Sequence, residues 1–582
     1  MRKTKIVCTL GPATDDLSVL RNICLAGMDV ARLNFSHGSF EEHEKRIKSL
    51  RQAAADTKKR VAIMLDTKGP EIRVGTFRDG FAELKAGCVF SLVTEKVLGN
   101  NERAHINYAG LPQDVNIGDK ILLDDGLIEL RVEDKGPGQV ICRVINGGKL
   151  FAGKGVNLPG VKINLPAMSK KDREDLLFGF TQDIDFVAVS FVRKASDILD
   201  IRRLAEEHNA NVSLIAKIES QEAVENFAEI LEVSDGIMIA RGDLGVEISA
   251  EEVPLVQKMI VEACNKSGKP VITATQMLES MIRNPRPTRA EASDVANAIF
   301  DGTDAVMLSG ETAVGAFPVQ AVQTMARIAE RTEKALQYQQ ILEFFKPVED
   351  KKVTEAIGYA TCYTAQELGV SAIITSTQSG HTARMVSKFK PEARIVAVTT
   401  SEKIANHLML VWGVFPVVTA PSRNTDEMFE NAMTAALQEG YIKNGDMVVL
   451  TAGVHVGVPG TTNLLRVDTV GEIILKATGV GKEAATGLAF VVKDEVHMAA
   501  MRQGQVLVSK STDSTFLPYM KKASGLIVEE GGLTSHAAIV GINLGIPVIV
   551  GAKNATSIIK ENEMVTIDPV RGLVYRGKAK IL

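Results

Sequence analysis

Eight short apolar runs with β-strand character recur along the first half of the chain, and segments with helical periodicity separate most of them. The runs cover residues 5–10, 30–35, 61–67, 185–191, 213–219, 236–241, 270–275 and 305–310. Each run is apolar at almost every position, which is typical of strands buried on both faces of a parallel sheet. Eight such strands alternating with helices predict a closed (β/α)8 barrel, the TIM-barrel fold.

One interval between these strands is far too long for a single helix. Residues 68–184 contain Gly-rich turns and period-two alternation, which predict a small β-barrel domain inserted after the third strand, where it could act as a lid. After residue 335 the pattern changes to an open α/β domain, and the last hundred residues form another compact unit. The predicted domains are the barrel (1–69 and 166–335), the inserted β domain (70–165), the α/β domain (336–474) and the C-terminal domain (475–582).

Composition and charge exclude several classes of protein. The net charge of −4 argues against a general nucleic-acid-binding protein. The chain has neither a signal peptide nor an apolar stretch long enough to span a bilayer, so we expect no membrane association. The six cysteines form no CxxC pattern, which favours reduced thiols in a cytosol. We therefore expect a cytoplasmic protein.

Polar residues follow the predicted strands at the ends where a barrel of this kind carries its active site. They are Arg32, Asn34, Ser36, Asp66, Thr67, Arg73, Lys217, Glu219, Gly242, Asp243 and Thr275. The set combines cations, carboxylates and small hydroxyls, and it lacks a His or Cys nucleophile. This inventory suits an anionic, metal-bound substrate and phosphoryl or enolate chemistry, in which positioning and electrostatic stabilisation supply most of the rate.

Three of these residues form the sharpest local pattern. Lys217 and Glu219 lie two apart on one strand and so share a face, and Asp243 ends the next strand. Two carboxylates with open positions suit Mg²⁺ held jointly with an anionic substrate. A surface salt bridge explains Lys217 and Glu219 equally well when they are considered alone. Asn34 and Ser36 have a similar alternative, because they could simply cap the following helix.

Longer motifs resemble those of pyruvate kinases over residues 1–475. They are GPAT (11–14), ARLNFSHG (31–38), LDTKGPEIR (65–73), AGKGVNLPG (152–160), SFVRKASD (190–197), AKIES (216–220), IARGDLGVEI (239–248), the stretch 272–315 and SGHTAR (379–384). The resemblance implies an allosterically regulated phosphotransferase of the last step of glycolysis. It would transfer the phosphoryl group of phosphoenolpyruvate to ADP and so form pyruvate and ATP.

The same resemblance implies roles for the strand-end residues. Lys217, Arg32 and Thr275 would be catalytic, with Lys217 stabilising the transferring phosphoryl group and the enolate. The substrate would also be bound by Gly242 and Asp243 at a helix start.

Metal and nucleotide sites are implied in the same way. Glu219 and Asp243 would hold Mg²⁺ or Mn²⁺. The oxygen-only set matching the family's K⁺ site is Asn34, Ser36, Asp66 and Thr67. Relatives that dispense with K⁺ carry Lys at the position of Glu71, so Glu71 implies K⁺ dependence. The residues matching nucleotide contacts are Asn34, His37, Arg73 and Lys154, although Arg73 alone is better explained as a solvated surface charge.

The α/β domain contains a loop that resembles the family's phosphate-binding effector loop. Its residues are Thr377, Ser379, Gly380 and Thr382. Hydroxyls at a helix start make an anion site, although a turn with N-capping hydroxyls fits the same residues. Segment 454–463 lacks the aromatic and Arg pattern of fructose-bisphosphate-responsive relatives, which leaves AMP or a sugar monophosphate as the effector. The resemblance also implies a homotetramer.

The C-terminal segment GGLTSHAAIVGINLGIPVIVG resembles the swivelling phosphohistidine domain of phosphoenolpyruvate-utilising enzymes, and His536 matches the phosphorylated residue. Gly541 and Ile542 replace the usual Ala-Arg, and the chain has no room for the ATP-binding domain of those enzymes. We therefore expect a structural or regulatory remnant rather than a working phosphocarrier.

Two other functions fit parts of the sequence. A barrel aldolase or lyase also uses Glu and Asp on a Mg²⁺–enolate, but Lys217, the inserted lid and Lys154 favour a nucleotide-dependent enzyme. A phosphohistidine dikinase is disfavoured by the missing kinase domain.

Overall fold

The computed structural model describes residues 1–166, 168–347, 352–453, 462–579 and 581. It divides into two units. Unit 1 contains residues 1–345, 384–390 and 401–416, and unit 2 contains residues 346–383, 391–400 and 417–582. Residues 454–461, which form most of the segment used above to judge the effector, lie outside the described residues.

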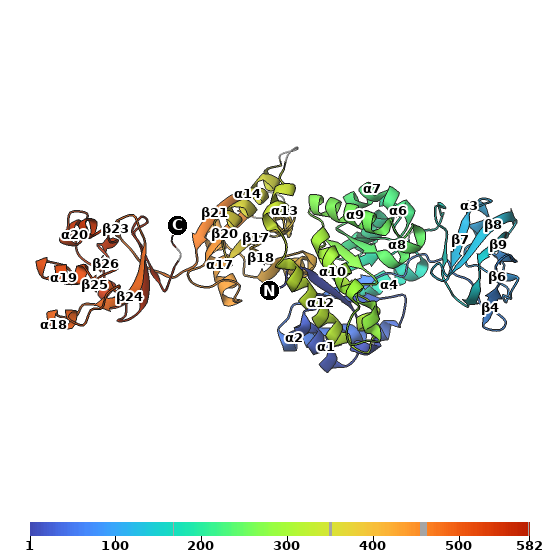
Figure 1. Cartoon of the computed structure of the whole chain (residues 1–582), viewed down its shortest axis with the longest axis horizontal. Coiled ribbons are helices and arrows are strands. Elements are labelled where there is room, and N and C mark those ends of the chain that lie inside the picture. Colours follow the sequence, from blue (N-terminus) through green and yellow to red (C-terminus); the bar gives the residue numbers. More distant parts are fainter. Residues whose placement is uncertain (167, 348–351, 454–461, 580, 582) are drawn as a thin grey trace. The chain divides into compact units, whose positions relative to one another are not determined.

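Eight parallel strands close into a barrel in unit 1 (Figure 1). In barrel order they are β1 (Lys5–Thr9), β16 (Ala305–Leu308), β15 (Val271–Ala274), β14 (Gly236–Ala240), β13 (Ser213–Ile218), β12 (Phe186–Val189), β3 (Ala62–Asp66) and β2 (Val30–Asn34). These strands correspond to the eight apolar runs, so the predicted barrel is confirmed. Each carries alternate side chains into the barrel interior and toward the surrounding helices, and both sets are buried.

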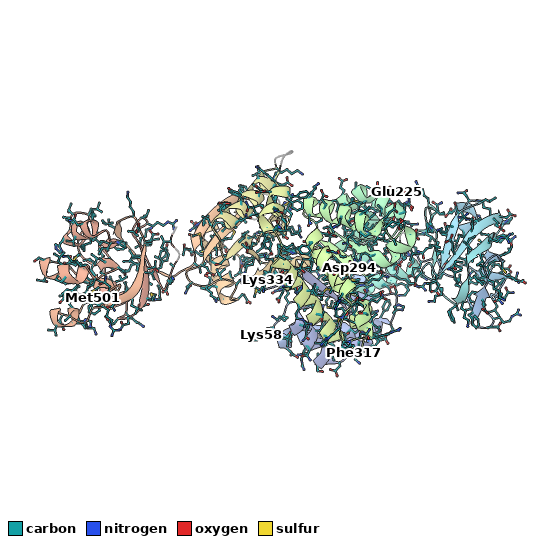
Figure 2. All side chains as sticks on the ribbon, viewed as in Figure 1. Lys58, Glu225, Asp294, Phe317, Lys334 and Met501 are labelled. Carbon is teal, nitrogen blue, oxygen red and sulfur yellow. The ribbon has the colours of Figure 1, made fainter. Side chains whose placement is uncertain are left out.

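The helices of unit 1 begin at sequence signals that satisfy their first N–H groups. Ser39, Ser169 and Thr288 each form a capping box with an acidic residue three positions later. Lys58, labelled in Figure 2, ends the second helix in the left-handed conformation. The helices are α1 (Leu17–Ala26), α2 (Phe40–Thr57), α4 (Lys170–Thr181), α5 (Ala195–Glu207), α6 (Gln221–Glu225), α7 (Phe227–Val233), α8 (Arg241–Glu247), α9 (Val253–Ser267), α10 (Arg289–Asp301), α11 (Gly310–Ala313), α12 (Pro318–Glu333) and α13 (Tyr338–Phe344).

The insertion after β3 is rich in strands, as predicted, and they form two sheets. One sheet has the order β11 (Val156–Asn157), β7 (Lys120–Leu123), β8 (Ile128–Gly136), β9 (Gln139–Asn146), β5 (Val89–Val93) and β6 (Arg103–His105). A separate pair joins β10 (Gly148–Phe151) to β4 (Phe81–Leu84), and the short helix α3 covers Leu111–Asp114. The insertion has its own apolar core, which includes Phe90, Leu92, Leu130 and Val140.

Unit 2 contains an α/β sheet and a C-terminal sheet domain. In the first, β18 (Arg394–Thr399), β17 (Ala372–Ser376), β20 (Met447–Gly453) and β21 (Thr462–Thr469) are neighbours in that order. The helices α14 (Val353–Glu367) and α17 (Thr425–Gln438) also belong to unit 2. The segments of unit 1 in this part of the chain contain α16 (Glu402–His407) and most of α15 (His381–Ser387) and β19 (Val414–Val418).

The C-terminal sheet has eight strands, with helices between them. The strand order is β22 (Ile473–Lys476), β29 (Leu573–Arg576), β28 (Met564–Asp568), β24 (Ala485–Val491), β25 (Val506–Ser509), β26 (Gly525–Val528), β27 (Val548–Val550) and β23 (Thr478–Val480). The helices are α18 (Glu495–Met498), α19 (Leu517–Met520), α20 (His536–Leu544) and α21 (Ala555–Ile558).

Candidate active site

Lys217 is the centre of a buried polar cluster at the C-terminal ends of the barrel strands. Its ammonium nitrogen lies 2.9 Å from Glu219 Oε1, 3.2 Å from Asp66 Oδ1 and 2.7 Å from Ser190 Oγ. Lys217 is 8% exposed and Glu219 is 2% exposed. The structure therefore brings Lys217 and Glu219 together as a buried pair, and the surface salt bridge considered above is wrong.

The charges around Lys217 determine its protonation. Burial alone would lower the pKa of Lys217, but the carboxylates of Asp66 and Glu219 outweigh burial and raise the pKa above its usual value. Lys217 is therefore a permanent cation at neutral pH. A cation fixed in a buried site is suited to stabilise charge that develops on a substrate oxygen.

Asp66, at the end of β3, joins Lys217 to Arg32. Asp66 Oδ2 lies 2.5 Å from Arg32 Nε, and Arg32 Nη1 donates a hydrogen bond to Thr9 Oγ1 at 2.9 Å. Burial would raise the pKa of Asp66, but Arg32 and Lys217 together hold it below its ordinary value. Asp66 is consequently an anion that orients two cations toward the same strand end.

Asp243 lies in the first turn of α8, directly after β14, close enough to Glu219 for their charges to repel. Burial, reinforced by this repulsion, raises the pKa of Asp243 to about 7. Glu219 is held from its other side by the backbone N–H of Phe191, at 2.6 Å from Oε2. Across the described residues, no group of three or more His, Cys, Asp or Glu side chains is placed to hold a metal ion. Glu219 and Asp243 could supply two oxygen ligands to a cation and leave its other coordination positions open.

The raised pKa of Asp243 makes the metal-free protein sensitive to pH. The folded carboxyl binds a proton with a pKa near 7, whereas the unfolded carboxyl releases it near the ordinary value of 3.8. Stability from this group therefore falls as pH rises from about 4 to about 7 and is constant above that range. In EDTA, we expect the melting temperature of Asp243→Asn minus that of wild type to grow between pH 5 and pH 7 in scanning fluorimetry. A difference that does not change with pH would contradict this prediction.

Thr275 follows β15 in a conformation that is unusual for a β-branched residue, with φ at 68°. Its hydroxyl accepts a hydrogen bond from Gly242 N at 2.7 Å, at the start of α8. Its carbonyl accepts one from Arg241 Nη2 at 2.9 Å, and Arg241 is paired at 2.7 Å with Asp294 of α10, which is labelled in Figure 2. These contacts hold Thr275 beside the helix start predicted to bind an anion, and strained backbone of this kind is concentrated at functional sites.

The predicted monovalent-cation set lies at the C-terminal ends of β2 and β3 and in the residues that follow them. Asn34 Oδ1 accepts a hydrogen bond from the backbone N–H of Ser36 at 3.1 Å, and Thr67 is 3% exposed. The alternative that Asn34 and Ser36 cap the next helix is wrong. The cap of α2 is Ser39, whose hydroxyl accepts from the N–H of Glu42.

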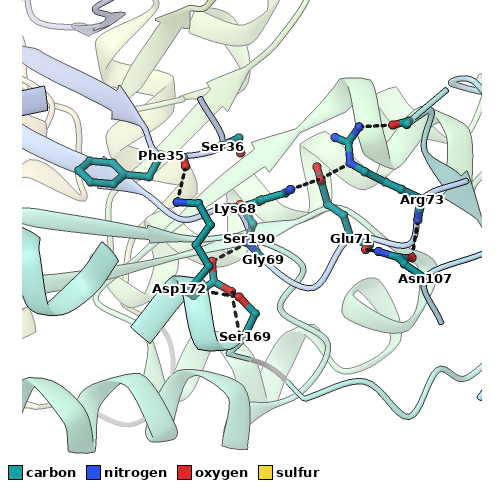
Figure 3. A network of polar contacts seen from close by, with 12 residues as sticks. Phe35, Ser36, Lys68, Gly69, Glu71, Arg73, Asn107, Ser169, Asp172 and Ser190 are labelled. Atoms are coloured by element: carbon teal, nitrogen blue, oxygen red, sulfur yellow. Dashed lines mark hydrogen bonds and ion pairs between the residues drawn. The ribbon is translucent and has the colours of Figure 1, made fainter. Parts of the chain in front are cut away.

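A cavity of about 270 Å³ joins the carboxylates to two predicted nucleotide contacts, because Glu219, Asp243, Arg73 and Lys154 all line it. Arg73 Nε lies 2.6 Å from Glu71 Oε2, and Figure 3 draws this ion pair. The other two predicted contacts, Asn34 and His37, do not line the cavity, and His37 is exposed.

Lys154 is held in the cavity wall by an ion pair with Asp124, 2.7 Å away. Arg73 and Lys154 thus place two cations on the inserted domain, in the same cavity as the carboxylates of the barrel.

The predicted effector loop of unit 2 makes two side-chain hydrogen bonds among the described residues. Thr377, Ser379 and Gly380 lie in the loop between β17 and α15, and Ser379 Oγ accepts a hydrogen bond from the backbone N–H of His381 at 3.4 Å. This contact fits the capping alternative. Thr382 Oγ1 lies 2.7 Å from Thr462 Oγ1.

His536, the candidate phosphohistidine, is the first residue of α20. Its Nδ1 lies 3.1 Å from Thr512 Oγ1.

Sequence reasoning assigned no role to Ser190, Phe191 or Arg241, although all three contact the site. Ser190 could have been found, because it lies at the C-terminal end of the fourth predicted strand, where the other strands supply polar residues. Phe191 could not, because its contribution is a backbone N–H turned toward Glu219 by a φ of 54°.

Comparison with known proteins agrees with this geometry. Three family models match: pyruvate kinase, barrel domain (residues 1–322); pyruvate kinase, alpha/beta domain (355–468); and PEP-utilising enzyme, mobile domain (501–572). The pyruvate kinases of Bacillus licheniformis and Geobacillus stearothermophilus are each 54% identical to this chain over the full length of both proteins. A pyruvate kinase structure from Cryptosporidium parvum superposes with a TM-score of 0.76 at 41% identity, covering 80% of this chain and 96% of that one. The strand-end cluster of the barrel and these full-length relatives lead to one conclusion: the chain belongs to the pyruvate kinase family.

Proposed function

We propose that this enzyme transfers the phosphoryl group of phosphoenolpyruvate to ADP, with Lys217 as the central catalytic residue. The observation that carries this proposal is the buried Lys217 ammonium between Asp66 and Glu219. Glu219 in turn lines the cavity that also contains Arg73 and Lys154. In the reaction, the bond between phosphorus and the enol oxygen breaks, and a bond from phosphorus to an ADP oxygen forms. The enolate that remains takes a proton at carbon to become pyruvate.

Each strand-end residue has a task in this reaction. Arg32 binds the phosphate, and Lys217 stabilises first the phosphoryl group in transfer and then the enolate oxygen. The backbone at Gly242 and Asp243, at the start of α8, binds the substrate carboxylate. Thr275 contacts the substrate near the carbon that is protonated.

The residues present fit the two cations that the family uses. Glu219 and Asp243 would hold Mg²⁺ or Mn²⁺, and a cation there would relieve the repulsion that raises the pKa of Asp243. The oxygen ligands for K⁺ would be Asn34, Ser36, Asp66 and Thr67. When bound, the divalent cation supplies positive charge to the carboxylate and phosphate oxygens of the substrate.

The test is an assay that couples pyruvate formation to NADH oxidation. We expect turnover to require ADP, a divalent cation and K⁺ together. Pyruvate formation without ADP would contradict the proposal and favour a lyase. The same assay with AMP and with a sugar monophosphate would examine the further proposal that the loop of Thr377, Ser379, Gly380 and Thr382 binds a phosphorylated effector.

We also propose a cytoplasmic homotetramer. All six cysteines are free thiols, which fits a reducing compartment. No helix in the described part of the chain is long and apolar enough to cross a membrane. Light scattering on the purified protein would give the number of subunits.

For the C-terminal domain, we propose a structural or regulatory role in which His536 carries no phosphate. Its Nδ1 is engaged by Thr512, and Gly541 and Ile542 stand where phosphocarriers have Ala-Arg. After incubation with ³²P-labelled phosphoenolpyruvate, we expect no acid-labile label on the wild type. Acid-labile label on the wild type that is absent from His536→Ala would overturn this assignment.

A further inference from the structure

Ser190 lies just beyond the end of β12 and connects the residues of two predicted sites. It is 3% exposed. Its oxygen lies 2.7 Å from Lys217 Nζ, 2.6 Å from the carbonyl oxygen of Thr67 and 3.2 Å from Asp66 Oδ1. Its backbone N–H also donates to Thr67 Oγ1 at 3.1 Å. Ser190 thus contacts the catalytic lysine and the end of β3 at the same time.

The chemistry of a hydroxyl fixes the direction of these hydrogen bonds. Ser190 has one proton, and the short contact to the Thr67 carbonyl, which can only accept, takes it. The oxygen then presents its lone pairs to Lys217, whose ammonium has three N–H donors. Those three donors are matched by Ser190, Asp66 and Glu219. Ser190 is the neutral member of the three, so it directs the ammonium without adding charge.

The next residue extends the same arrangement to the predicted divalent site. Phe191 has φ of 54°, and its N–H donates to Glu219 Oε2 at 2.6 Å. Gly69 packs against both residues, close to Ser190 in Figure 3. A Cβ added at Gly69 would lie 2.9 Å from Ser190 Cβ and 2.8 Å from the Phe191 ring, and φ there is 73°. Residues 190–191 are thus contacted by Thr67, Glu219 and Gly69.

We propose that Ser190 is a positioning residue for phosphoryl transfer, whose hydroxyl holds the Lys217 ammonium at a fixed place between Asp66 and Glu219. The inference rests on the proposed function, because it assigns Ser190 to the lysine that stabilises the transferring group. Without the hydroxyl, one Lys217 N–H loses its acceptor and the ammonium shifts toward the carboxylates. Misplacement of a catalytic group by about 1 Å can cost about 100-fold in rate.

The test compares Ser190→Ala with Ser234→Ala. Ser234 is a matched control because it is 2% exposed and donates to the carbonyl of Ile230 at 2.7 Å, just before the start of β14 at the opposite end of the barrel. We expect Ser190→Ala to lower kcat by about 30-fold. We expect KM for phosphoenolpyruvate, and the Kd for Mn²⁺ measured by electron paramagnetic resonance without substrate, to change less than about threefold. Ser234→Ala should keep wild-type kcat, and Ser190→Thr, which retains the hydroxyl, should recover most of the loss.

The possible outcomes distinguish failure of the positioning role of Ser190 from failure of the proposed function. A kcat for Ser190→Ala within threefold of wild type would overturn the inference, and so would a loss carried by KM or by Mn²⁺ affinity. Equal melting temperatures for the two alanine variants, together with unequal kcat, would support positioning over a merely structural role. Absence of ADP-dependent turnover in the wild type would reject the proposed function itself, independently of Ser190.

Discussion

Lys217→Met should lower kcat by about 1,000-fold while the protein remains folded. Removing a single group that stabilises developing charge in a buried site costs about 100- to 1,000-fold, and Lys217 is proposed to act on both the phosphoryl group and the enolate. Methionine retains most of the aliphatic stem and removes the charge. The measurement is the coupled assay at saturating substrate, with circular dichroism to confirm the fold.

A second buried lysine provides the control. Lys5 is 2% exposed at the start of β1, and its ammonium donates to the carbonyl of Val414 at 2.6 Å. Lys5→Met should lower stability and leave kcat within about twofold of wild type, because it removes a buried hydrogen bond away from the strand ends that carry the site. If Lys217→Met retained more than a tenth of wild-type activity, the central role of Lys217 would be wrong.

Glu219→Gln should weaken divalent-cation binding by about 100-fold and lower kcat/KM by at least as much. The substitution keeps the shape and removes one of two anionic ligands, and even the loss of an indirect contact to a metal site costs 10- to 100-fold. The lost charge also removes a partner of Lys217, 2.9 Å away. Titration with Mn²⁺ by electron paramagnetic resonance measures the binding effect without reference to catalysis.

Glu247 is the matched carboxylate for this experiment. It lies on α8 and lines the same cavity, and its Oε1 accepts a hydrogen bond from Asn157 Nδ2 at 2.9 Å. Glu247→Gln should leave the Kd for Mn²⁺ within about threefold of wild type. Equal weakening by both variants would indicate a general electrostatic effect of the cavity and would remove Glu219 from the proposed metal site.

The position of the site could be predicted from sequence because parallel strands in a barrel all end at the same rim. That rule alone brought Lys217, Glu219 and Asp243 together from two separate runs. It could not decide whether the Lys217–Glu219 pair was exposed, because burial depends on what the other strands and the insertion place around it.

The contacts of Phe191 and Arg241, which could not be predicted from the sequence, depend on backbone conformation. The N–H of Phe191 reaches Glu219 only because φ is 54°, and Thr275 is held at φ of 68° by Arg241. These positive φ angles could not be predicted from residue type, because Phe and Thr ordinarily avoid them. The helix-capping alternative for Asn34 failed for a simpler reason, because residues 35–39 separate it from α2 and Ser39 occupies the cap.

The order of residues in unit 1 has a consequence for the synthesis of the protein. β1 pairs with β16, and Asp304, just before β16, contacts Lys390 Nζ at 2.8 Å and the backbone N–H of Trp412 at 3.2 Å. During synthesis, β1 therefore cannot pair with β16 until residue 305 and its neighbours have been made. The carboxylate of Asp304 has no ion pair with Lys390 until residue 390 has been made. At ribosomal rates of about 5–20 residues per second, the interval from Lys5 to Leu308 is about 15–60 s. During that time the nascent barrel has open strand edges, and such edges can pair with other chains.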